Sequence, residues 1–159
     1  MMTISLEYKP DNGIVYGKTF IPWGTTRKKV RETLQSEYEI SDQEFAGTVS
    51  RRDIYNQLKG QPVFLFLIYD SNDQFSELEI RSGIELNIFD KTINFEMQFW
   101  DAVDTLDKVS SMQKIIDEGE ALFIDLKLSL CSGASMSGDQ EDNQLSYIYC
   151  AQDISHLLD

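Results

Sequence analysis

The sequence has few of the residues on which catalytic and metal sites usually depend. Its 159 residues include one histidine, His156, and two cysteines, Cys131 and Cys150. A histidine-based triad or metal site would therefore rest on His156 alone, and its place near the end of the chain favours a structural or solvated side chain. The cysteines are 19 residues apart, without the spacing of a zinc motif. Two readings stay open for them: reduced structural thiols, or a disulfide formed in an oxidising compartment.

Long apolar runs are also lacking. The longest is the seven-residue run Val63–Tyr69, whereas a helix needs about 20 apolar residues to cross a bilayer. The first seven residues do not combine a basic region with an apolar stretch, as a secretory signal would. The sequence therefore predicts a cytoplasmic protein.

Familiar catalytic and cofactor motifs are missing. There is no GxGxxG or P-loop sequence, and Ser135 lacks the second glycine of a GxSxG elbow because position 137 is serine. The acidic groups at 70–73 and 139–142 do not have the ligand spacing of an EF-hand. We therefore expect no cofactor, no metal and no enzymatic activity. An enzyme of unfamiliar type is a further hypothesis, and it would require a cleft with converging polar groups.

Basic residues are scarce in one part of the chain. Residues 1–60 carry 9 Lys+Arg and 8 Asp+Glu, a net charge of +1, whereas residues 61–159 carry 5 and 19, a net charge of −14. These values sum to the −13 of the whole chain. Such a surface repels nucleic acid and anionic membranes and attracts basic partners. We expect a basic protein partner, although the acidity could instead serve solubility.

Alternating apolar residues predict most of the strands. The segments with this pattern are Thr3–Lys9, Phe75–Arg81, Ile84–Ile88, Ile93–Met97, Leu122–Leu130 and Leu145–Tyr149. A turn at Asp11–Gly13 predicts a hairpin with the strand that begins at Ile14. Val63–Tyr69 is apolar on both faces and is expected to be a central strand. Residues 63–97 are thus predicted to form four consecutive antiparallel strands. In Phe75–Arg81, Phe75 is expected on the same face as Glu77.

Helical spacing predicts the helices. Thr25 and Thr26 form a helix N-cap before Val30 and Leu34, which lie four residues apart on one face. Apolar residues spaced by four and three predict a second helix over Phe99–Leu106. Three further expectations complete the pattern: residues 112–119 continue a helix, residues 37–60 are rich in loops, and residues 132–143 form a mobile loop. The last apolar residues, 154–158, are expected to form a short helical turn.

Together these elements predict a single α+β domain over residues 1–159. We expect a mainly antiparallel sheet with two or three helices packed on one face. At this length a domain buries roughly 70% of the surface that its unfolded chain exposes, so its core needs no disulfide or metal ion. The order strand, helix, strand, strand occurs twice, which indicates an internal duplication. The two copies are Phe20–Leu34 with Val63–Ile80, and Ile93–Leu106 with Leu122–Leu130 and Leu145–Tyr149.

The first predicted helix begins with basic residues. Arg27, Lys28, Lys29 and Arg31 occupy its first turns, where the helix dipole favours acids by up to about 1 kcal/mol. Two interpretations are open. Acidic parts of the fold could neutralise these residues locally, or the residues could form a positive spot for an acidic group on a partner.

The same segment carries a resemblance to a known family. Phe20-Ile21-Pro22-Trp23-Gly24-Thr25-Thr26 followed by Arg27–Leu34 is similar to a bacterial pattern of strand, Gly, Thr and a helix written Thr-Arg-x-x-Val-Arg-x-x-Leu. Leu67–Asp73 and Leu78-Glu79-Ile80 resemble its tyrosine-aspartate turn and the following strand. The pattern resembles immunity proteins of polymorphic toxin systems and the repeat of beta-lactamase-inhibitor-like folds. It covers residues 20–95, departs from the pattern at Trp23 and carries over no functional residue.

The acidic residues are the candidate partner-binding residues. We expect Asp70, Asp73, Glu77 and Glu79 at one end and face of the sheet. Asp101 and Asp104 are expected on the exposed side of the second helix, and Asp139, Glu141 and Asp142 in the mobile loop. With the resemblance, they point to an immunity-type inhibitor that neutralises a basic toxin by blocking its surface. The alternative is an interaction or scaffold domain without inhibitory activity, which would form homodimers through a sheet edge.

Overall fold

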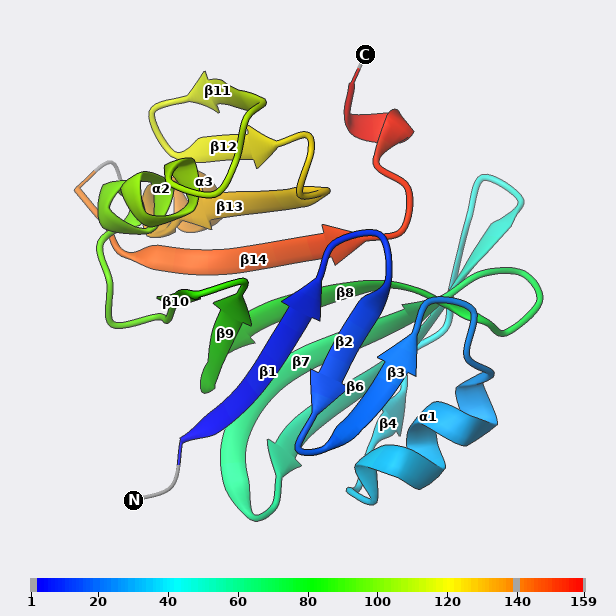
Figure 1. The fold of residues 1–159 in the computed structure, drawn as a ribbon. Helices are drawn as coiled ribbons and strands as arrows, with labels where there is room; N and C mark the ends of the chain where they lie inside the picture. Colours follow the sequence, from blue (N-terminus) through cyan, green and yellow to red (C-terminus); the bar gives the residue numbers. More distant parts are fainter. Residues whose placement is uncertain (1–2, 139–140, 159) are drawn as a thin grey trace.

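The computed structural model of the protein describes residues 3–138 and 141–158 (Figure 1). The strands in this part are β1 (Ile4–Lys9), β2 (Gly13–Tyr16), β3 (Thr19–Pro22), β4 (Glu39–Ile40), β5 (Gln43–Phe45), β6 (Thr48–Leu58), β7 (Gln61–Tyr69), β8 (Phe75–Ser82), β9 (Ile84–Ile88), β10 (Lys91–Ile93), β11 (Gln113–Asp117), β12 (Glu120–Phe123), β13 (Leu128–Ser132) and β14 (Leu145–Ala151). The helices are α1 (Arg27–Leu34), α2 (Phe99–Asp107), α3 (Gly133–Ser137) and the 3-10 turn η1 (Ser155–Leu157).

These strands form two sheets. The five-stranded sheet has the order β10-β9-β1-β2-β3, and the nine-stranded sheet has the order β11-β12-β13-β14-β8-β7-β6-β4, with β5 paired to β6. Among the described residues, β1 and β9 pair in parallel and the other strand pairs are antiparallel. The predicted α+β class with a mainly antiparallel sheet is thus confirmed.

The main core lies between the two sheets. One cluster of buried side chains includes Leu6 of β1, Leu86 of β9, Leu67 of β7 and Ile148 of β14, and Figure 1 shows β1, β2 and β9 in front of the nine-stranded sheet. Successive residues of a strand point to opposite faces. The nine-stranded sheet therefore has an inner face toward the core and an outer face away from it.

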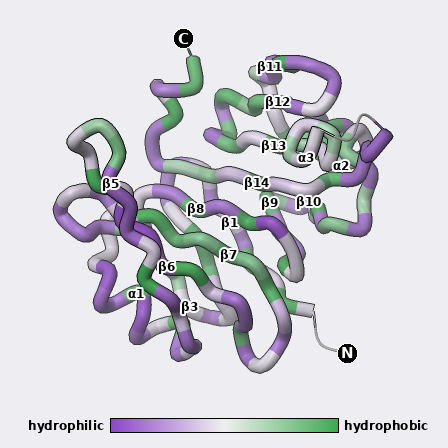
Figure 2. The backbone as a smooth tube through the Cα atoms, turned by 180° about the vertical axis from the view of Figure 1, so that it is seen from behind, coloured by the Kyte–Doolittle hydropathy of each residue, from purple (hydrophilic) through white to green (hydrophobic). Residues whose placement is uncertain are grey.

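The outer face is not wholly polar. A second, smaller cluster of buried residues lies on it, formed by Leu122, Tyr149, Ala151 and Ile154. In Figure 2, which shows the molecule from behind, β7 is largely hydrophobic and runs through the interior of this sheet. This is expected for the central strand predicted at Val63–Tyr69.

Helix α1 forms where its sequence predicts it. The Thr26 side chain accepts a hydrogen bond from the Lys29 backbone N–H, and Val30 and Leu34 are buried. Arg27 and Arg31 both donate to Asp53. Acidic residues of the fold therefore neutralise these two arginines, which agrees with the first interpretation of the basic helix start.

Helix α2 also agrees with its sequence pattern. It buries Phe99, Ala102, Val103 and Leu106, and it packs against β10, β13 and β14. These helical residues share one cluster with Leu128 and Leu130 of β13. Helix α2 therefore covers the inner face of the nine-stranded sheet, and its exposed aspartates point away from that sheet.

The prediction of a loop-rich segment at 37–60 is wrong. This segment contains β4, β5 and the eleven-residue strand β6. The hairpin of β5 and the start of β6 projects from the body (Figures 1 and 2), and Phe45 at its tip is 83% exposed. A hairpin without a buried face has no reason to alternate apolar and polar residues, so the strand signal is missing.

Three predictions in the second half of the chain are also wrong. Residues 112–119 contain strand β11, not a helix. The single strand expected at Leu122–Leu130 is two strands, β12 and β13, which are joined by a turn where Lys127 has a φ of 50°. The alternation continues through this turn because Leu126 is also buried. Residues 132–143 contain α3 as well as loop, and residues 139–140 lie outside the described part.

Three of the four strands expected in residues 63–97 are present, but the prediction of a strand at Ile93–Met97 is wrong, because β10 ends at Ile93 and residues 94–97 form a turn. The strands of this segment also do not form one meander. β7 pairs with β8 and β9 pairs with β10, yet β8 and β9 belong to different sheets. The chain crosses between the sheets at Gly83, where φ is +79°. A Cβ there would lie 2.3 Å from the Pro62 carbonyl oxygen, so glycine is required for this close approach.

An irregularity in β8 changes the face of one residue. Phe75 is expected beside Glu77, but it is fully buried in the main core. The register explains this, because Ile68 pairs with Glu77 while Tyr69 pairs with Phe75. The extra residue, Ser76, forms a β-bulge that turns Phe75 inward.

The starts of the two longer helices are joined to the sheet in the same way. The cap residue Thr26 of α1 forms a bridge with Gln74, and the cap residue Gln98 of α2 forms one with Gln144. Next to these bridges, the Phe75 N–H donates to Thr25 and the Leu145 N–H donates to Met97. The cap residues are 72 residues apart and their bridge partners are 70 apart.

The helices of the described residues are short. The longest, α2, has nine residues, and none has the length and apolar character that a membrane-spanning helix needs.

Candidate functional site

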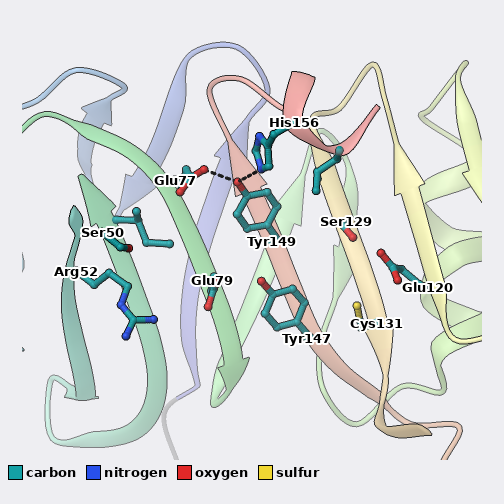
Figure 3. A pocket seen from close by; sticks show the side chains of 12 residues that line it. Ser50, Arg52, Glu77, Glu79, Glu120, Ser129, Cys131, Tyr147, Tyr149 and His156 are labelled. Carbon is teal, nitrogen blue, oxygen red and sulfur yellow. Dashed lines mark hydrogen bonds between the residues drawn. The ribbon is translucent and has the colours of Figure 1, made fainter. Parts of the chain in front are cut away.

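A hollow of about 370 Å³ opens on the outer face of the nine-stranded sheet (Figure 3). Its walls come from β6, β7, β8, β12, β13 and β14 and from the turn η1. The lining residues are Ser50, Arg52, Ile68, Glu77, Glu79, Glu120, Ser129, Cys131, Tyr147, Tyr149, His156 and Leu157. Three carboxylates thus face one guanidinium among the lining residues.

The centre of the hollow is the pair of strands β8 and β14. Glu79 lies directly opposite Tyr149 in the register of this pair. The Tyr149 hydroxyl donates to Glu77 Oε1 at 2.5 Å (Figure 3). Burial is the main cause that raises the pKa of the Tyr149 phenol, and the Glu77 carboxylate adds to it. The phenol therefore stays protonated and acts as a donor to the carboxylate.

Tyr147 lies two residues before Tyr149 on β14, and its phenol is likewise close to a glutamate, Glu79. Burial raises the pKa of its phenol, and the nearby Glu79 carboxylate raises it further. Register also brings Cys131 of β13 opposite Tyr147 and Glu120 of β12 opposite Cys131. The hollow therefore presents two tyrosine rings between a pair of glutamates on one side and a third glutamate on the other.

His156 closes one end of the hollow. Its Nε2 atom lies 3.2 Å from the Tyr149 hydroxyl oxygen, and its side chain is otherwise exposed. Leu157, from the same turn, packs against the small cluster on the outer face. His156 thus helps to hold the turn η1 over the sheet, in line with the structural role expected from the sequence.

The two cysteines lie on opposite faces of the sheet. Cys150 belongs to the main core, whereas Cys131 lines the hollow, and both are free thiols. This agrees with the reading as reduced structural thiols. Burial raises the pKa of the Cys131 thiol to about 12. A nucleophilic cysteine needs a lowered pKa, so Cys131 does not have the properties of a catalytic thiol.

Arginine side chains already lie on the aromatic part of the outer face. The Arg81 guanidinium carbon lies 5.2 Å from the ring centroid of Phe66 and 5.8 Å from that of Tyr147. Arg52 lies 5.2 Å from the same Phe66 ring. Arg81 approaches the Glu79 carboxylate only to 3.9 Å, a long ion pair. These contacts have the geometry of cation–π interactions.

The structure brings only two of the predicted acidic residues into this hollow, Glu77 and Glu79. Asp70 holds the turn before β8, because its carboxylate accepts hydrogen bonds from the Asn72 and Gln74 backbone N–H groups. Asp73 lies 3.3 Å from Arg51 and 3.5 Å from Arg27, so its charge is largely matched.

The other predicted residues lie elsewhere. Asp101 and Asp104 are exposed on α2, on the far side of the sheet from the hollow. Asp142 accepts a hydrogen bond from the Gln144 backbone N–H, and Glu141 is exposed beside it. Asp139 lies outside the described residues. The predicted acids therefore occupy several parts of the surface.

Sequence reasoning missed most of the lining. Glu120, Ser129, Cys131, Tyr147 and Tyr149 come from three strands, and only the register of those strands brings them beside Glu77 and Glu79. One signal was present in the sequence, because Tyr147 and Tyr149 are two residues apart and must share a face of their strand.

Neither a metal-binding group nor a known relative identifies the site. Within residues 3–138 and 141–158, no three His, Cys, Asp or Glu side chains converge to hold a metal ion. Comparisons of the chain with protein-family models, curated proteins and solved structures found no significant match.

Proposed function

We propose that the protein is an immunity-type inhibitor that binds a basic toxin and neutralises it by covering its surface. The observation that carries the proposal is the hollow on the outer face, where Glu77, Glu79 and Glu120 outnumber Arg52 among the lining residues and Arg81 approaches Glu79 only to 3.9 Å. The net charge of −13 supports it as well, because a strongly acidic protein attracts a basic partner over long distances. The chain is proposed to act by binding in the cytoplasm and to catalyse no reaction.

Electrostatic complementarity would act mainly on the rate of association. Complementary charge raises association rate constants by orders of magnitude at low salt, and the effect weakens as ionic strength rises. For an inhibitor this is useful, since the toxin must be captured before it reaches its target. Neither nucleic acid nor a membrane is a proposed partner, because both repel an acidic surface.

A second function has one observation in its favour. β11 is an edge strand of the nine-stranded sheet, and Ile115 and Ile116 on it are 41% and 42% exposed. Exposed apolar edge strands pair readily with other chains. An interaction domain that forms homodimers through this edge is therefore the alternative.

A second proposal concerns the origin of the fold. We infer an internal duplication, with the helices of the two copies on one face. The matching hydrogen bonds at the starts of α1 and α2 support the duplication, because they join equivalent positions to the sheet.

The experiment is a neutralisation assay. Each basic protein encoded beside the gene of this chain is expressed in a bacterial host, with and without the chain. We expect one of them to stop growth alone, to permit growth with the chain, and to form a complex with it in gel filtration. If none is toxic or none forms a complex, the inhibitor proposal is wrong. Light scattering on the chain alone tests the alternative, which requires a stable dimer.

A further inference from the structure

The hollow combines two kinds of group that recognise one type of side chain. Glu77 and Glu79 provide carboxylates on β8, and Tyr147 and Tyr149 provide rings on β14, the neighbouring strand. A guanidinium group binds carboxylates through paired N–H donors and stacks on aromatic rings with its flat face. Ammonium groups lack the flat face, so rings and carboxylates together favour arginine over lysine.

The outer face already accommodates guanidinium groups of the chain itself. Arg81 lies within 6 Å of the rings of Phe64, Phe66 and Tyr147. Arg52 stacks over Phe66 as well. Arg52 lies toward β6 and β7, whereas Arg81 of β8 also reaches the Tyr147 ring on β14. Among the described residues, no arginine lies over the ring of Tyr149, so the part of the hollow around Tyr149 and Glu77 is open to a further guanidinium.

We propose that this open part of the hollow is the docking site for an arginine side chain of the basic partner. The flat face of the guanidinium would pack against the ring of Tyr149, and Glu77 and Glu79 on the neighbouring strand would accept its hydrogen bonds. The Tyr149 hydroxyl already holds the Glu77 carboxylate in place, so little reorganisation accompanies binding. The inference rests on the proposed function and names the surface that performs it.

The size and shape of the site agree with this occupant. A hollow of about 370 Å³ is large enough for a long side chain and too small for a folded element of a partner. Ser129 and Cys131 are buried in its floor, where the aliphatic part of an arginine side chain would lie. We expect the partner to insert one arginine and to make its other contacts around the rim.

A peptide series tests the chemistry without a known partner. The probes are three short peptides of identical sequence with arginine, lysine or citrulline at the central position, and the readout is the shift of backbone amide NMR signals. We expect the arginine peptide to shift the signals of Tyr147, Tyr149 and Glu77, and to bind about tenfold more tightly than the lysine peptide. Citrulline has the same shape without charge, so equal shifts with the citrulline peptide would overturn the proposal.

Paired variants separate the site from the net charge. Glu77→Gln with Glu79→Gln removes two charges from the hollow, and Asp101→Asn with Asp104→Asn removes two from the exposed face of α2. We expect the first variant to weaken arginine-peptide binding by about tenfold or more, and the second by less than about twofold. Equal losses would show that only net charge matters. Urea unfolding of both variants checks that each is folded.

The same variants distinguish failure of the site from failure of the function. If a toxin is found and the Glu77→Gln, Glu79→Gln variant still neutralises it fully, the docking site is wrong and the inhibitor proposal stands. If the arginine peptide binds in the hollow but no neighbouring protein is neutralised, the site stands and the inhibitor proposal is wrong.

Discussion

The guanidinium of Arg27 and the carboxylate of Asp53 form an ion pair that joins helix α1 to strand β6. The Arg27 Nη2 atom lies 2.7 Å from Asp53 Oδ1, and the Asp53 side chain is 0% exposed. Arg31 donates to the same carboxylate at 2.7 Å. Asp53 is thus a buried charge that depends on two arginines from one face of α1, which explains why a helix with a basic start is stable here.

Loss of Arg27 should destabilise the protein strongly. Arg27→Met leaves the buried carboxylate with Arg31 as its only charged partner, and removing one member of a buried pair costs about 3 kcal/mol. Lys28→Met is the matched control, because Lys28 is an exposed neighbour on the same helix and should change the free energy of unfolding by less than about 0.5 kcal/mol. Urea denaturation measures both. Equal effects would contradict the structural role of the pair.

Acid should release part of this network. A hydrogen bond from Arg27 is the main cause that holds the pKa of Asp42 below its ordinary value of 3.8. A lowered folded-state pKa gives stability that is full above the ordinary pKa and is lost as pH falls through the folded value. We therefore expect Asp42→Asn to lose less stability than the wild type between about pH 5 and about pH 2.

Chemical denaturation at several pH values measures this difference. Glu44→Gln, which changes an exposed carboxylate on β5, serves as the control and should follow the wild-type profile. The prediction is wrong if Asp42→Asn and the wild type lose stability in parallel on acidification.

Two glycines with similar backbone angles should respond differently to alanine. Gly83 and Gly60 have φ values of +79° and +74°. At Gly83 a Cβ would meet the Pro62 carbonyl oxygen at 2.3 Å, whereas at Gly60 nothing lies within 4 Å. Gly60→Ala should cost about 1 kcal/mol from backbone strain alone, and Gly83→Ala about 3 kcal/mol or more because the strand crossing must shift. Thermal and urea unfolding test this order, and a larger cost at Gly60 would refute it.

The thiols should be unreactive in the folded protein. Cys150 is fully buried and Cys131 is 8% exposed, and burial raises the pKa of both thiols. With an aromatic disulfide reagent at about pH 8, where ordinary thiols are partly ionised, we expect slow labelling of the native protein and rapid labelling of two thiols in denaturant. Cys131→Ser identifies which residue reacts first. Rapid labelling of the native wild type would show that the hollow exposes Cys131 as a thiolate.

The sequence predicts elements well where one face of a segment is buried. β1, α1 and α2 each bury alternate or helically spaced residues, and their positions could be read from that spacing. The β5–β6 hairpin buries none of its residues from Gln43 to Ser50, so its strands leave no periodic trace. Leu126 has the opposite effect: it is buried in a turn, so the alternation continues across β12 and β13 and predicts one strand in place of two.

Strand partners could not be predicted in the same way. The pattern of Ile84–Ile88 identifies a strand, but it does not say that the strand pairs with β1 in parallel and not with β8. The candidate site depends on such pairings, since Glu120 of β12 and Glu79 of β8 line one hollow only because β13 and β14 lie between their strands. Glu77 and Glu79 could be found because they lie on one strand, and the tyrosines could be assigned to them only through the structure.

Glu79 and Tyr149 face each other in the β8–β14 pair and are 70 residues apart, the same interval as Gln74 and Gln144. Leu78 pairs with Cys150 and Ile80 with Ile148, so a local two-fold axis relates the backbones of the two strands at the Glu79–Tyr149 pair, as in any antiparallel pair. A true homodimer would have to place identical side chains on both sides of such an axis. Because one chain supplies both strands, a carboxylate can stand on one side and a phenol on the other. The two sides of the hollow at this pair are therefore chemically different, which two identical strands could not provide.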